Sequence, residues 1–156
     1  MKRILAIFLA VIMILTFPTI SYASDFSDNE TNSYIEYYSD GSYSITTIET
    51  STIRVLANST VAKNKTFTYY SSKNEKEWEI TVTGTFNYTG SSATCTNSTV
   101  SYKIYDTHWK VVSAQASKSG RVATGEFTLK RYTLGVPIKT VNETLTITCS
   151  NTGVCS

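Results

Sequence analysis

Hydrophobic and polar residues alternate with a period of two along most of this chain. Between residues 76 and 89, apolar side chains stand at Trp78, Ile80, Val82, Phe86 and Tyr88, and the intervening positions are mostly Glu and Thr. The same alternation recurs at residues 100–104, 123–129 and 145–149. Alternation of this kind is typical of antiparallel strands with one buried and one wet face. The apolar spacing of an amphipathic helix is absent from these segments.

Turn residues separate the alternating segments. Asp40-Gly41 lies between two tyrosine-rich runs, and this dipeptide suits the type I′ turn of a β-hairpin. Frequent turns without crossover helices favour an all-β fold. We therefore predict an antiparallel β-sandwich (immunoglobulin-like), with a small β-barrel as the alternative. The expected strands are 34–39, 42–49, 52–57, 65–71, 76–89, 93–105, 108–116, 121–132 and 136–149.

The first 23 residues have the features of a signal peptide. Lys2 and Arg3 precede an apolar run over residues 4–15, and Ser21 and Ala23 supply small residues for cleavage after Ala23. The run is shorter than the roughly 20 residues of a membrane-spanning helix. The sequence thus predicts a secreted, extracellular protein without stable membrane insertion.

Charge is unevenly distributed in the rest of the chain. The full sequence has 14 Lys and Arg against 12 Asp and Glu, and removal of Lys2 and Arg3 makes the two numbers equal. This balance argues against nucleic acid as a partner. Residues 24–60 nevertheless contain six acidic residues and one basic residue. We expect an acidic N-terminal arm with a probable β-hairpin at 24–60, which is either solvated surface or a removable prosegment, followed by a β-sandwich domain at 61–156.

Three cysteines allow one disulfide bond and one remaining thiol. On the chain-entropy model, a loop of about 55 residues between Cys95 and Cys149 contributes about 4 kcal/mol, against about 2.4 for Cys149 with Cys155. We prefer Cys95 with Cys149 and keep the shorter loop as the alternative. In the preferred pairing, Cys155 is available for a dimer through an intermolecular bond.

Residues for catalysis or metal binding are sparse. His108, the single histidine, follows Asp106 by two positions, and Glu75, Glu77 and Glu79 alternate along one expected strand. Such carboxylates suit glycoside hydrolysis or a calcium site, but beside Lys73 and Lys76 they are more often partners in cross-strand ion pairs. No Gly-x-Ser-x-Gly elbow occurs. We therefore assign no catalytic residue and expect neither a cofactor nor a metal.

Tyrosine supplies the best lead to a binding site. The chain contains 11 tyrosines, and adjacent pairs on a strand place one ring on each face. Exposed rings stack on sugars or anchor protein interfaces, whereas buried rings pack in the core. The candidate binding residues are Tyr37, Tyr38, Tyr43, Tyr69 and Tyr70.

Basic residues gather in the second half of the chain, where they protect strand edges or meet anionic wall polymers or lipid headgroups. They are Lys110, Lys118, Arg121, Lys130, Arg131 and Lys139.

Four segments resemble a family of small secreted all-β proteins of Gram-positive, clostridia-like bacteria. They are residues 78–95, Ser117-Lys118-Ser119-Gly120, Leu134-Gly135-Val136 and the run from Leu145 to Cys149. The similarity covers roughly residues 65–153. It implies a domain of unknown function without an assigned activity or cofactor, and it supports pairing Cys95 with Cys149. Cys155 and the acidic arm lie outside the pattern.

These observations favour a non-catalytic extracellular module that binds a glycan, cell wall or protein ligand. One alternative is a secreted carboxylate-dependent hydrolase, with Glu77, Glu79, Glu126 and Asp106 as its acids. That hypothesis requires two of the acids to meet in one pocket. Another alternative is a secreted effector or toxin-like protein that is activated by loss of residues 24–60.

Overall fold

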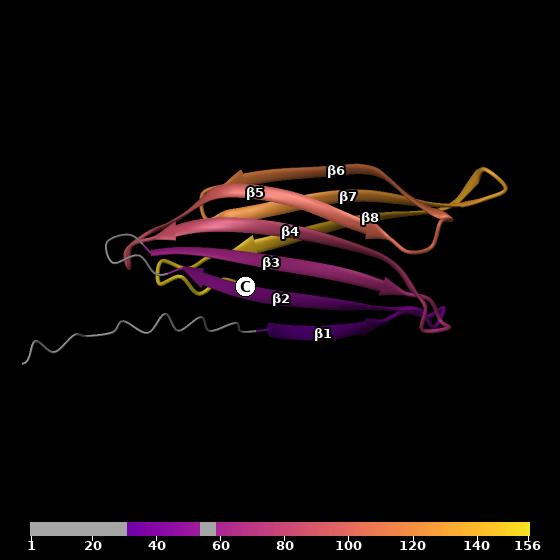
Figure 1. Cartoon of the computed structure of the whole chain (residues 1–156), viewed down its shortest axis with the longest axis horizontal. Coiled ribbons are helices and arrows are strands. Elements are labelled where there is room, and N and C mark those ends of the chain that lie inside the picture. Colours follow the sequence, from indigo (N-terminus) through magenta and orange to yellow (C-terminus); the bar gives the residue numbers. More distant parts are fainter. Residues whose placement is uncertain (1–30, 54–58) are drawn as a thin grey trace, which may run out of the picture.

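Eight antiparallel strands form two sheets in the computed structural model, which describes residues 31–53 and 59–156 (Figure 1). One sheet has the order β1-β2-β3-β4-β5 and the other β6-β7-β8. The predicted signal peptide and the first acidic residues of the arm lie outside the described residues. The strands are β1 (Thr31–Tyr37), β2 (Tyr43–Ile53), β3 (Ser59–Tyr70), β4 (Lys76–Tyr88), β5 (Ala93–Ile104), β6 (Trp109–Ser119), β7 (Val122–Thr133) and β8 (Val136–Thr148).

The two sheets pack face to face, and the predicted β-sandwich is confirmed. The core comes from the inward positions of β3, β4, β7 and β8, where the alternating residues of the sequence meet. Trp78, Ile80 and Val82 of β4 pack there against Phe127, Leu129 and other residues of the smaller sheet. Strands β1 and β2 extend the larger sheet beyond β8, the edge of the smaller one (Figure 1). This extension creates the cleft described below.

Strand order within each sheet follows the sequence. This arrangement of two consecutive meanders differs from the Greek-key order of immunoglobulin domains. The hairpin predicted around Asp40-Gly41 is present, and β2 pairs with β3 as far as Ile53, so that the hairpin continues the larger sheet. Its loop has three residues instead of two, because Gly41 alone adopts a positive φ of 80° and its N–H bonds to Tyr38 O.

Two strands are longer than the sequence predicted. The expected strands 42–49 and 52–57 are one strand as far as Ile53, beyond which residues 54–58 are not described, and β3 begins at Ser59 instead of residue 65. Lysines at inward positions obscured the alternation in β3. Lys63 is buried and donates from Nζ to Cys155 O at 2.6 Å, and Lys65 Nζ bonds to Thr146 O at 3.2 Å.

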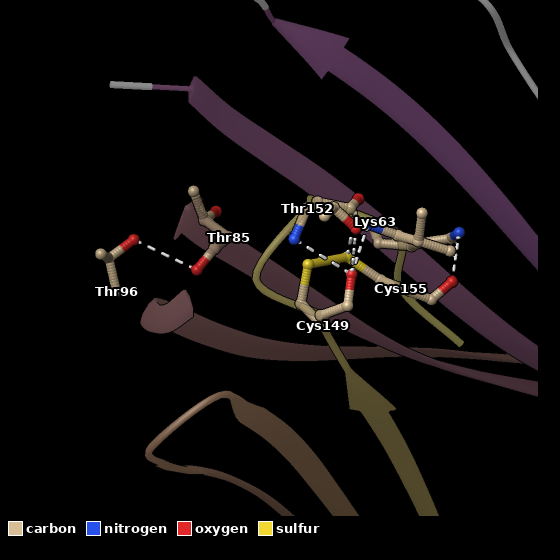
Figure 2. The surroundings of a disulfide bond; sticks show 9 residues. Lys63, Thr85, Thr96, Cys149, Thr152 and Cys155 are labelled. Carbon is tan, nitrogen blue, oxygen red and sulfur yellow. Dashed lines mark hydrogen bonds between the residues drawn. A yellow bond between two sulfur atoms is a disulfide. The ribbon is translucent and has the colours of Figure 1, made fainter. Parts of the chain in front are cut away.

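The preferred pairing of Cys95 with Cys149 is wrong. Cys149 bonds to Cys155 (Figure 2). Cys95 is a buried free thiol. After β8 the chain turns back, and Cys149 and Cys155 become opposite partners in an antiparallel bridge, whereas Cys95 lies in β5 of the other sheet. Burial raises the pKa of the Cys95 thiol. The intrachain bond leaves Cys155 without a free thiol for an intermolecular disulfide.

In the parts of the chain that the structure describes, no helix is long and apolar enough to cross a membrane.

Candidate functional site

The candidate tyrosines separate into two groups on opposite faces of the larger sheet. Tyr37, Tyr43 and Tyr70 are register neighbours on β1, β2 and β3 and share the outer face. Tyr43 and Tyr70 stack with ring centroids 4.8 Å apart, and Tyr37 lies 5.7 Å from Tyr43 and is 75% exposed. Because the rings of Tyr43 and Tyr70 lie against each other, they offer little flat surface to a ligand.

Tyr38 and Tyr69 belong to the inner face. Their ring centroids are 6.1 Å apart, and Tyr69 stacks on Trp78 at 5.1 Å. Trp109 meets the edge of this stack, with its ring 5.8 Å from that of Trp78. The hydroxyl of Tyr38 donates to Ser44 Oγ at 3.1 Å, and partial burial raises the pKa of the Tyr38 phenol. An aromatic cluster therefore continues from the core to the corner between β1 and β2.

A cleft of about 260 Å³ opens at the end of this aromatic cluster. One wall comes from the turn after β1 and from β3 and β4, and the other comes from β8, where the smaller sheet ends. The cleft is smaller than the 300–1,000 Å³ usual for drug-sized ligands. Its size fits one ring-sized unit. The lining residues are Tyr38, Ser39, Asp40, Tyr69, Trp78, Lys139, Val141 and Glu143.

Charged groups of opposite sign face one another at the cleft. Lys139 Nζ lies 3.7 Å from Asp40 Oδ2 and donates to the Tyr69 hydroxyl at 3.1 Å. Hydrogen bonds from the hydroxyl and the N–H of Ser42 lower the pKa of Asp40. Burial raises the pKa of Glu143, and the neighbouring charge of Glu36 raises it further. The cleft therefore contains an ionised carboxylate, an ammonium group and a carboxyl that resists ionisation.

Trp78 lies in the wall of the cleft with an unused hydrogen-bond donor. Its side chain is fully buried, and among the buried side-chain nitrogen and oxygen atoms of the described residues, its Nε1 alone has no hydrogen-bond partner. Such groups are uncommon, because an unsatisfied buried N–H costs about 1–3 kcal/mol. Trp109 provides a contrast, since its Nε1 donates to Glu77 Oε2 at 2.8 Å.

Two of the proposed hydrolase acids do approach each other, but as part of a structural cluster. Glu77 Oε1 and Asp106 Oδ2 lie 3.8 and 3.6 Å from the guanidinium of Arg131. Asp106 accepts hydrogen bonds from the N–H and ring of His108. Although partial burial opposes it, these bonds hold the pKa of Asp106 below its usual value. His108 thus lies in the turn before β6, where its N–H and ring bond to Asp106.

The other acids lie apart from this cluster. The run of Glu75, Glu77 and Glu79 does not occupy one face, because a register shift between β3 and β4 leaves Glu77 without a partner and turns it inward. Glu79 pairs with Lys76 on the outer face. Glu126 lines a separate polar hollow on the outside of the smaller sheet, beside Gln115 and Thr144.

Sequence reasoning missed most residues of the cleft, among them the three strand residues Trp78, Lys139 and Glu143. The sequence pattern places Trp78 on the buried face of a strand and indicates edge protection for Lys139, and it gives no signal for Glu143. All three point inward near the end or edge of a sheet. Whether such a position is covered or lines a cleft depends on how far the two sheets overlap. In the described part of the chain, no group of three or more His, Cys, Asp or Glu is arranged to hold a metal ion.

Comparisons with protein-family models, curated proteins and solved structures found no match to this chain. The geometry of the cleft and of the surface therefore carries the functional argument.

Proposed function

We propose that this protein is a secreted, non-catalytic binding module and that its cleft receives one sugar unit of an extracellular glycan or wall polymer. The observation that carries the proposal is the aromatic wall of the cleft, where Tyr38 packs against Tyr69 and Tyr69 stacks on Trp78, whose buried indole N–H has no hydrogen-bond partner. Sugar rings present apolar faces to aromatic side chains and hydroxyls to polar groups, so that one ligand satisfies both features of the wall.

The charged groups of the cleft support the same ligand class. Asp40 offers acceptor oxygens and Lys139 offers donors, while the protonated form of Glu143 does both. A mixture of donors and acceptors around an aromatic wall suits a neutral polyhydroxylated ring better than a strongly charged ligand.

Secretion is the second part of the proposal. It rests on the charged, apolar and small-residue segments at the start of the sequence. The Cys149–Cys155 bond is compatible with an oxidising extracellular environment. The intact mass of the protein recovered from the culture medium would test cleavage after Ala23.

Hydrolysis is the second candidate function, and its acids would differ from those that the sequence suggested. Glu143 and Asp40 line one cleft, and their pKa values are shifted in opposite directions. Such divergence is typical of an acid and base pair. The release of new reducing ends from a bound polymer would favour hydrolysis over simple binding.

Binding measurements with variants inside the cleft and a control variant outside it test the proposal. The probes are glucose, galactose, N-acetylglucosamine and isolated bacterial wall polysaccharide. Lys139→Met and Glu143→Gln change the cleft, whereas Tyr37→Ser changes the exposed end of the outer tyrosine row. Affinity for a sugar or the polysaccharide should fall about tenfold or more with the cleft variants. Affinity that falls only with Tyr37→Ser, or no binding to any of these probes, would contradict the proposal.

A further inference from the structure

The hairpin between β7 and β8 ends in an unusual turn. Leu134 and Gly135 are its two central residues, with φ values of 50° and 81°. A two-residue turn with both φ values positive strongly prefers Asn-Gly, because a bulky side chain is disfavoured in the left-handed region. Leu134 is also 100% exposed. Leu134 is thus disfavoured by the conformation of the turn and makes no contribution to the core, which points to a contact with another molecule.

Further apolar side chains surround the tip. Val136 is 61% exposed and Ile138 is 60% exposed. Ile138 has no partner in the register, where Tyr132 pairs with Pro137 and Arg131 with Lys139. In Figure 1 this hairpin extends beyond the ends of the other strands, so that its tip is accessible without movement of the sandwich.

Basic residues stand behind the apolar tip. Lys110 and Lys130 are directly opposite each other on β6 and β7, and Lys110 Nζ lies 5.3 Å from the ring of Tyr132. Within the described residues, neither lysine forms an ion pair with an acid. On the other face, Arg131 is paired with Asp106 and Glu77, and Lys139 with Asp40. The net charge behind the tip is therefore carried by Lys110 and Lys130.

We propose that this hairpin tip docks on the surface of an anionic lipid bilayer. Along β7 from the tip, Leu134 comes first, then Tyr132 and then Lys130, which follows the order of acyl chains, headgroup boundary and phosphates. At about 3.3 Å per residue, Tyr132 lies about 7 Å and Lys130 about 13 Å behind Leu134. Contact is peripheral and reversible, because it buries only a few side chains, and it would hold the cleft near a cell surface.

Co-sedimentation with vesicles tests this proposal. The full chain is mixed with vesicles of phosphatidylcholine alone and of phosphatidylcholine with phosphatidylglycerol, in 0.1 M and 0.5 M salt. Leu134→Asn is the decisive variant, because asparagine suits the left-handed turn and should preserve folding. Val154→Asn is its matched control, since Val154 is 71% exposed in the turn after β8. All variants carry the same N-terminal segment, so that a difference in binding comes from the substituted residue.

The wild-type chain should bind the anionic vesicles, and binding should weaken in high salt. Leu134→Asn should lower the affinity by about tenfold or more, whereas Val154→Asn should leave it unchanged. Replacement of both Lys110 and Lys130 by Gln should remove most of the preference for anionic lipid. Equal binding by the wild type and Leu134→Asn, or no wild-type binding to either kind of vesicle, would overturn the proposal. Because none of these residues lines the cleft, sugar binding and vesicle binding succeed or fail separately.

Discussion

The carboxylate of Glu77 accepts a hydrogen bond from the indole nitrogen of Trp109 across the two sheets. The distance is 2.8 Å, and both side chains are buried. Glu77 comes from β4 and Trp109 from β6, so that this bond links the larger sheet to the smaller one. The backbone oxygen of Glu77 also accepts the N–H groups of Tyr105 and Asp106 in the connection between the sheets. Glu77 therefore holds the connection between the two sheets in place through both its side chain and its backbone.

Replacement of Glu77 should lower the free energy of unfolding, and the loss should depend on whether the new side chain can still accept a hydrogen bond from Trp109. Glu77→Ala leaves the buried Trp109 N–H without an acceptor, and we expect a loss of about 1–3 kcal/mol in the free energy of unfolding. Glu77→Gln keeps an oxygen at the same position and should cost less. Urea unfolding of both variants measures the difference. Equal losses would contradict a role for the hydrogen bond to Trp109 and would point to the charge facing Arg131, which both variants remove.

Stability should depend on pH through Glu143. Burial and the charge of Glu36 raise its pKa, so the folded state binds the proton more tightly than the unfolded state. This contribution is complete below the ordinary pKa of 4.5 and is lost as the pH rises through the higher folded value. Glu143→Gln should therefore gain stability relative to the wild type between pH 4 and pH 7. Thermal unfolding at both pH values provides the test, and a difference that does not change with pH would contradict the assignment.

The disulfide bond should stabilise the last turn modestly. Cys149 and Cys155 lie six positions apart in the sequence, and closing so short a loop contributes about 2.4 kcal/mol on the chain-entropy model. Cys155→Ser should lower the free energy of unfolding by about that amount. Peptide mapping without reductant should recover the Cys149–Cys155 link. Alkylation of Cys95 should require unfolding, because its thiol is buried, and rapid alkylation in native buffer would contradict this placement.

Gly84 allows the two sheets to approach each other. A Cβ at this position would lie 2.8 Å from the Cβ of Ala123 in the opposite sheet and 2.6 Å from the ring of Phe86. We expect Gly84→Ala to destabilise the protein by about 1–3 kcal/mol through overpacking. Thr83→Ala, on the outer face of the same strand, is the matched control and should cost less than about 1 kcal/mol. Similar losses in the two variants would argue against a tight contact at Gly84.

Alternation was sufficient to predict strands wherever a strand's inward residues are apolar. Trp78, Ile80 and Val82 illustrate this case in β4, and Leu145 and Ile147 in β8. The rule failed at Lys63 and Lys65, whose inward amines are satisfied by carbonyl oxygens of the C-terminal segment. A sequence pattern does not reveal those carbonyls, because they arrive from a distance of more than 80 residues.

The candidate site was predictable only in part. Placing Tyr37 and Tyr38 on opposite faces follows from the strand period alone, and the structure agrees. The cleft arises because β1 and β2 extend past β8, which depends on how the sheets overlap. The disulfide prediction was wrong because loop entropy favours the longer loop, whereas a tight turn after β8 brings Cys155 next to Cys149. Local chain reversal decides this pairing.

The most direct test of the proposed sugar site is the indole region of a ¹⁵N–¹H spectrum. The chain has two tryptophans, and Trp→Phe variants assign their two side-chain signals. Trp109 is already bonded to Glu77, whereas Trp78 lines the cleft and its buried Nε1 has no hydrogen-bond partner. When glucose, galactose or N-acetylglucosamine is added, the Trp78 signal should shift in a saturable manner and more than the Trp109 signal. A bound sugar that leaves the Trp78 signal unmoved, or no saturable shift with any of the three sugars, would contradict the account.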